Sequence, residues 1–170
     1  ASTGDATDFG DLTVARGHGC GTSNQTRCCM MGGSASSGNQ DVIDFITTAS
    51  TGNAVDFGNL LEATEHACGA SSPTRGFFGG FYPRGDGTID VVNIASKGNA
   101  TLFGGPGSLF TDYAASACSN SIRGIYAGGT NYPNPGTGYT RLIQYITMSS
   151  DGNAIDFGDL SELSYSGIGV

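Results

Sequence analysis

Basic residues are scarce in this sequence, and the few that are present do not cluster. Seven Lys and Arg stand against fifteen Asp and Glu, which gives a net charge of −8. A nucleic acid or an anionic membrane would need a basic patch to meet its phosphate groups. The composition therefore predicts no nucleic-acid partner and no binding to an anionic membrane surface.

Long apolar runs and helical periodicity are also absent. No apolar run approaches the roughly 20 residues of a membrane-spanning helix, so no membrane insertion is expected. There is no leader of the signal-peptide kind, and the chain opens at Ala1 without Met, which suggests a processed product or part of a longer array. No window places apolar residues at spacings of three and four, so almost no helix is expected.

Turn-forming residues are abundant instead. The 29 glycines, five prolines and 13% charged residues favour short strands joined by tight turns. A length of 170 residues is typical of one domain. We therefore expect a single all-β repeat domain over residues 1–170.

One motif is written four times along the chain. It is Gly52-Asn53-Ala54-Val55-Asp56-Phe57-Gly58 in its clearest form, and its phenylalanines are Phe9, Phe57, Phe103 and Phe157, which lie 48, 46 and 54 residues apart. Self-similarity at such a period is typical of repeat architectures. We place the repeats at about 2–49, 50–95 and 96–149, with a partial fourth over 150–170.

Each repeat contains four candidate strands. The first carries Asp-Phe-Gly, the second carries a cysteine, the third runs from an arginine to a Gly-Gly doublet, and the fourth is the most regular, as in 42–48 and 89–95. Segments of variable length, 34–41, 81–88 and 130–141, precede the fourth strand. Such variation is expected of loops on one rim of a repeat array.

The pattern of four strands, Gly-Gly doublet and Ser-x-Gly-Asn-Ala-x-Asp-Phe-Gly resembles a kelch-like β-propeller blade, and in particular repeats of virion, tail or fibre proteins of tailed, often marine, bacteriophages. The resemblance implies a viral structural protein. Three blades are too few for a closed propeller, so it also implies closure by oligomerisation or a place in a longer array. A threefold β-trefoil or β-prism is the alternative fold.

The cysteines and histidines offer a candidate metal site. Cys20, Cys68 and Cys118 each precede the repeat arginine, and a cysteine at a repeated position is more often a small buried apolar residue than a ligand. His18 and His66 stand two residues before Cys20 and Cys68, and residues two apart on a strand face the same way. These four residues are the candidate zinc ligands, although the spacing departs from that of known sites, and no cofactor is expected.

The repeated aspartates and arginines have two interpretations each. Asp8, Asp56 and Asp156, with Asp11 and Asp159, could form a carboxylate ring for calcium or for acid catalysis, but Asp beside Gly more often caps its own backbone. Arg27, Arg75 and Arg123 are expected to bind backbone carbonyls or to pair with aspartates.

The function expected from these features is non-enzymatic: assembly with copies of itself or with other virion proteins, or host-surface recognition, on a virion surface or tail or otherwise outside the cell. No serine-hydrolase elbow, phosphate loop or zincin motif is present. The alternatives are a carbohydrate-binding adhesin, or a glycan-active enzyme on the same scaffold. The expected contact residues lie in the rim loops: Tyr82, Arg84, Asp86, Asn131, Tyr132, Asn134 and Tyr139.

Overall fold

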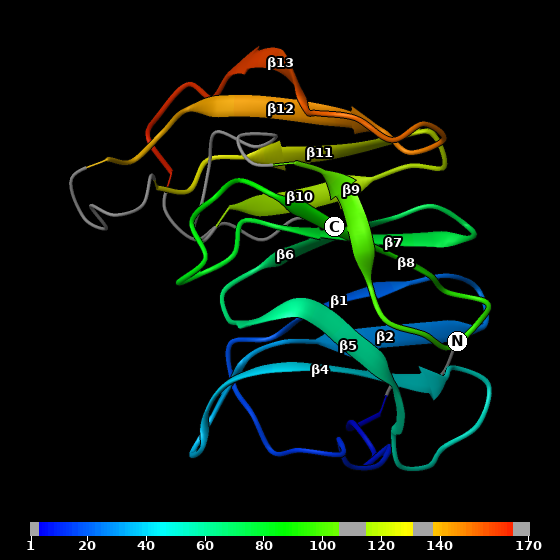
Figure 1. The fold of residues 1–170 in the computed structure, drawn as a ribbon. Coiled ribbons are helices and arrows are strands. Elements are labelled where there is room, and N and C mark those ends of the chain that lie inside the picture. Colours follow the sequence, from blue (N-terminus) through cyan, green and yellow to red (C-terminus); the bar gives the residue numbers. More distant parts are fainter. Residues whose placement is uncertain (1–3, 106–114, 131–137, 165–170) are drawn as a thin grey trace.

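The computed structural model describes residues 4–105, 115–130 and 138–164 and is entirely β in this part of the chain (Figure 1). The expected all-β fold is therefore confirmed. Over the same residues, no helix is long and apolar enough to cross a membrane.

The strands form three antiparallel sheets, each built on four strands paired in chain order, and sheet I has a short fifth strand. Sheet I consists of β1 (Cys20–Ser23), β2 (Arg27–Met31), β4 (Gly38–Thr47) and β5 (Val55–Thr64), and short β3 (Ser34–Ala35) pairs with the start of β4. Sheet II consists of β6 (Cys68–Ser71), β7 (Arg75–Gly79), β8 (Ile89–Asn93) and β9 (Thr101–Gly104). Sheet III consists of β10 (Ser116–Ser119), β11 (Arg123–Ala127), β12 (Leu142–Thr147) and β13 (Ile155–Asp159).

The sheets follow one another in an open series, with sheet II between the other two (Figure 1). The first strand of sheet II, β6, contacts the first strands of both neighbours, β1 and β10. A β-trefoil or β-prism would instead place three units around a threefold axis.

Two apolar cores fill the spaces between the sheets. One face of sheet I, which we call its front, packs against the back of sheet II in a cluster that includes Phe57 and Phe78. The front of sheet II packs in the same way against the back of sheet III, in a cluster that includes Phe103 and Tyr126. The fold therefore repeats one kind of sheet-to-sheet contact.

The sheets are offset by one strand from the sequence repeats. Each sheet begins with the cysteine or serine strand and ends with the Asp-Phe-Gly strand of the next repeat. The first copy of the motif, in residues 4–12, therefore has no sheet of its own and forms no strand. It lies against sheet I, where Gly52 N donates to Phe9 O at 2.8 Å and Ala54 N donates to Asp11 O at 2.8 Å.

The strand register corrects the alignment of the cysteines. Cys20 lies opposite Met31 and Cys68 lies opposite Gly79, but the residue opposite Ala127 is Ser116. Cys118 therefore stands two residues beyond the position of the other two, and the prediction that all three share one repeat position was wrong. The error arose because only the order of cysteine and arginine was compared, not the distance between them.

Candidate functional site

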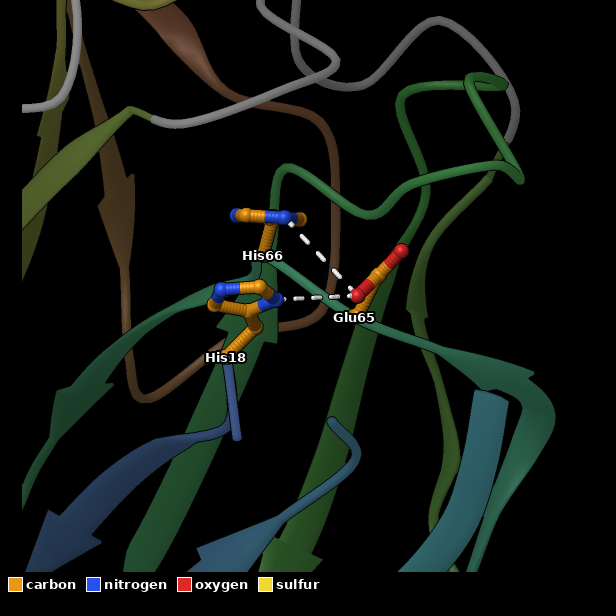
Figure 2. Close-up of side chains that lie close together, drawn as sticks. All are labelled: His18, Glu65 and His66. Atoms are coloured by element: carbon orange, nitrogen blue, oxygen red, sulfur yellow. Dashed lines mark hydrogen bonds and ion pairs between the residues drawn. The ribbon is translucent and has the colours of Figure 1, made fainter. Parts of the chain in front are cut away.

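A cluster of two histidines and one glutamate lies where sheet I connects to sheet II (Figure 2). His18 Nδ1 is 3.2 Å from Glu65 Oε2, and His66 Nε2 is 3.8 Å from the same oxygen. The two imidazole rings are stacked, with centroids 4.3 Å apart. One ligand-type atom from each of the three residues lies within 4.8 Å of the others, so among the described residues this is the group whose spacing could hold a metal ion.

The backbone explains why the two rings meet. His18 precedes β1 and His66 precedes β6, and both adopt left-handed φ angles, of 57° and 58°. His66 N donates to His18 O at 2.9 Å, which fixes the two residues side by side. The backbone of Glu65 is fixed as well, because its N–H and C=O both pair with the backbone of Tyr82.

Burial lowers the pKa of His66, and the neighbouring His18 acts in the same direction, while Glu65 opposes the shift. A neutral imidazole, which is the form that binds metals, is therefore favoured at this position. The His18 side chain is 61% exposed, so the cluster is open to solvent on that side.

The predicted zinc quartet does not form. His18 and His66 do meet, but Cys20 and Cys68 are not part of the cluster, because the left-handed histidines break the strand alternation that would put all four on one face. The Cys68 thiol instead donates to Gly79 O at 3.5 Å, and burial raises its pKa to about 12. Sequence reasoning missed Glu65, although it stands directly before His66.

A second missed feature is a buried aspartate at the same position of β4 and β8. Asp44 and Asp90 are both fully buried. Asp44 accepts hydrogen bonds from Thr13 N, Thr13 Oγ1 and Arg16 Nη1, at 3.2, 2.6 and 2.9 Å. The signal was visible in the sequence, where one Asp interrupts an otherwise apolar strand in two repeats.

Arg84, one of the expected contact residues, is bound at the Asp90 site. Arg84 Nη1 donates to Asp90 at 3.0 Å, Arg84 Nε donates to Asp86 at 3.1 Å, and the Arg84 side chain is only 6% exposed. Burial raises the pKa of Asp90, against the hydrogen bond from Leu61 N and the charge of Arg84. An arginine held in this way braces its own loop, and little of its side chain is exposed for a contact.

The remaining rim residues are only partly described. Tyr82 is half-buried and its ring stands edge-on to His66, at 6.4 Å between centroids. Tyr139 is 41% exposed and pairs with Thr130 across an isolated bridge. Asn131, Tyr132 and Asn134 lie outside the described residues.

The repeated aspartates do not form a carboxylate ring in the described part of the chain. Asp8 and Asp156 each accept a hydrogen bond from the N–H of the glycine two residues on, at 3.1 Å. The alternative interpretation, capping of their own backbone, is therefore confirmed for these two. Asp56 and Asp156 lie on the last strands of their sheets, β5 and β13, at the edges away from the first strands through which the sheets contact one another.

The repeated arginines bind carbonyls of the next sheet. Arg27 donates to Ile94 O and Ala95 O, at 3.0 and 2.9 Å, and Arg75 donates to Met148 O at 3.1 Å. Arg75 also pairs with Asp151 at 2.7 Å. The expected partners are thus confirmed for both residues, and the bonds join neighbouring sheets.

The Asp-Phe-Gly motif lies where the front of one sheet packs against the back of the next, a contact that we call the seam. Gly58 has a φ of 150°, and a side chain there would collide with the carbonyl oxygen of Gly98 in the next sheet. Gly10 meets Gly52 in the same way, whereas a side chain added at Gly158 would meet no described residue within 4 Å. The neighbouring phenylalanines agree: Phe57 and Phe103 are 2% and 4% exposed, but Phe157 is 58% exposed. Among the described residues, the front of sheet III is therefore left open, whereas the fronts of sheets I and II are each covered by the next sheet.

No protein-family model and no curated protein sequence matches the chain. Among solved structures, the chain is similar to one described as "Structure of YjhT", with a TM-score of 0.69 and 11% sequence identity. The match covers 92% of this chain and 60% of that structure, so the chain spans less than two thirds of its length. At this identity the likeness concerns the fold alone.

Proposed function

We propose that this protein is a non-enzymatic assembly protein, whose three sheets are kelch-like propeller blades completed by a second copy of the chain. The observation that carries the proposal is the open front of sheet III. Phe157 is exposed at the position where Phe57 and Phe103 are buried by the next sheet.

The back of sheet I is the surface that would contact the open front of sheet III in another copy of the chain. Its Met30 and Ile46 are only half-buried, whereas the equivalent residues are buried at both internal seams: Phe78 and Val92 in sheet II, and Tyr126 and Ile146 in sheet III. Because a front packs on a back at both internal seams, the open front of one copy fits the open back of another.

A front-to-back contact between copies is heterologous, so it continues until the ring closes. Two copies give six sheets, which lies within the four to eight blades of known propellers. Three copies would exceed that range. We therefore favour a two-copy ring over a longer series of copies.

Residues 4–12 compete with this contact. They carry the same Asp-Phe-Gly-Asp-Leu sequence as 156–160, and Phe9 O already accepts from Gly52 N, as Phe57 O accepts from Gly98 N. Because 4–12 belongs to no sheet while β13 pairs with β12, the N-terminal segment is the easier one to displace. Assembly between two chains would thus replace residues 4–12 of one chain by residues 156–160 of the other.

The biological setting that we propose follows the sequence resemblance: a structural or host-recognition component of a virion surface or tail. Two properties of the fold support an assembly role. The same seam occurs more than once within the chain. At its last position, Gly158 on sheet III, no described residue of another sheet is in contact. The contacts that build a seam are an aromatic side chain, a close backbone approach and an arginine bonded to carbonyls, and none of them is a reacting group.

Light scattering on the purified protein over a range of concentrations tests the proposal. Wild-type protein is expected to associate to a two-copy mass, and Phe157→Asp to remain a single chain. Leu102→Asp is the matched control, because Leu102 is 49% exposed on β9 of sheet II, away from the open front. Phe9→Ala, which weakens the competing segment, is expected to strengthen association. Equal association of Phe157→Asp and wild type would refute the proposal, and a wild-type protein that stays monomeric would point to further blades supplied by a longer chain.

A further inference from the structure

The His18, Glu65 and His66 cluster goes beyond the assembly role, because it lies at the closed junction between sheets I and II and not at the open front (Figure 2). His18 comes from the segment before β1, and Glu65 and His66 come from the connection between β5 and β6. The cluster therefore joins segments that are 47 residues apart in sequence.

The distances suit a tetrahedral metal ion. Zinc bonds of about 2.0–2.2 Å in a tetrahedron place neighbouring ligand atoms roughly 3.3–3.6 Å apart. The two nitrogen-to-oxygen distances are 3.2 and 3.8 Å, which bracket that range. Shifts of a few tenths of an ångström would bring the two nitrogen-to-oxygen distances to a metal-bound separation. The three ligand atoms lie within 4.8 Å of one another, and the two stacked rings would turn relative to each other so that both nitrogens face one ion.

Glu65 gives the cluster an anionic ligand that is largely shielded from water. Its side chain is only 14% exposed, and its ion pairs in the described part of the chain involve only the two imidazoles. A divalent cation bound beside this sheltered carboxylate would balance its charge.

The left-handed backbone at both histidines is the third observation. Non-glycine residues rarely adopt positive φ, and each instance costs on the order of 1–2 kcal/mol. Such conformations cluster at ligand-binding sites, where the surrounding structure holds them. In this protein two of them, one at each histidine, aim the rings at one carboxylate.

We propose that His18 Nδ1, His66 Nε2 and a Glu65 carboxylate oxygen bind one zinc ion, with a water molecule as the fourth ligand. Two imidazoles and one carboxylate are a common three-residue zinc set that leaves one position open. The solvent-exposed side of His18 provides room for that water. The ion would hold the segment before sheet I against the connection to sheet II.

Calorimetric titration of untagged, chelator-treated protein with zinc chloride tests the site. We expect one zinc ion per chain. His18→Asn combined with His66→Asn should abolish binding or weaken it by more than the roughly 10- to 100-fold that loss of an outer-shell partner costs. Asn is chosen because it tolerates the left-handed backbone, and an unchanged circular dichroism spectrum checks that the variant is folded.

The matched control distinguishes this ligand set from the cysteine-containing one. Cys20→Ser and Cys68→Ser should leave the zinc affinity unchanged, and cobalt-loaded wild-type protein should show tetrahedral d–d bands without thiolate-to-cobalt charge transfer. The chain has only two histidines, so the double variant has no other imidazole to offer. Absence of zinc binding, binding retained by the double Asn variant, or a thiolate band would each overturn the proposal.

Discussion

Substitution of the seam glycines by alanine gives a matched pair that isolates sheet-to-sheet docking. Gly58 and Gly158 occupy the same place in the motif, and their φ angles are 150° and 145°. An added methyl group at Gly58 would meet the carbonyl of Gly98, whereas at Gly158 it would meet no described residue within 4 Å. The two variants therefore share the backbone strain and differ in the clash.

The magnitudes follow from these contacts. Both variants should lose about 1–3 kcal/mol from the unfavourable φ. Gly58→Ala should lose about 1–3 kcal/mol more from overpacking. It also strains the hydrogen bonds from Gly98 N to Phe57 O and from Ala100 N to Asn59 O, at 2.9 and 2.8 Å, which contribute about 1 kcal/mol each. We expect Gly58→Ala to be less stable than Gly158→Ala by roughly 2–4 kcal/mol.

Urea unfolding followed by circular dichroism measures this difference. It should be done at a concentration where light scattering shows single chains, so that association does not contribute. Gly158→Ala should then show its second effect at higher concentration, as a loss of association. Equal destabilisation by the two substitutions would refute the account of the motif as a docking seam.

Three further predictions concern the interior. Asp44→Asn should destabilise the protein by about 3–5 kcal/mol, because it leaves the Arg16 guanidinium, whose side chain is 2% exposed, without its counter-ion; a loss below about 1 kcal/mol in urea unfolding would contradict this role. The Cys68 thiol, with a pKa of about 12, should resist alkylation at pH 8, where only about 1 in 10⁴ would be thiolate, while half-exposed Cys118 reacts first. Because folding holds the Cys68 thiol neutral, stability should fall as the pH rises above the ordinary thiol pKa. Mass spectrometry of native protein after brief labelling checks the order of reaction, and equal labelling of both cysteines would contradict it.

The sequence was sufficient to predict most of the strands, because their signals are local. Glycine pairs, alternating strands and the repeated motif indicate where strands begin and end, and the strand starts at Arg27, Arg75 and Arg123 agree with the expectation. The offset between repeat and sheet was not predictable in this way. It depends on which strand pairs with which, and the motif strand is bonded both to its own sheet and to the turn of the next.

The candidate site was only half predictable. The repeated histidines indicated that two imidazoles would meet, because equivalent positions of neighbouring sheets come together. Strand alternation then predicted the wrong additional ligands, Cys20 and Cys68, since it assumes extended backbone and both histidines are left-handed. No repeated pattern in the sequence pointed to Glu65. The residues that correspond to Glu65-His66 in the third repeat, at 113–114, are not Glu-His.

Direct imaging of the associated particle by electron microscopy tests the central claim most directly. The account predicts a closed ring of six sheets made by two chains, in which the front of each sheet III is covered by the back of the partner's sheet I. A filament, or a pair of chains in contact through any other surface with the front of sheet III still open, would contradict it.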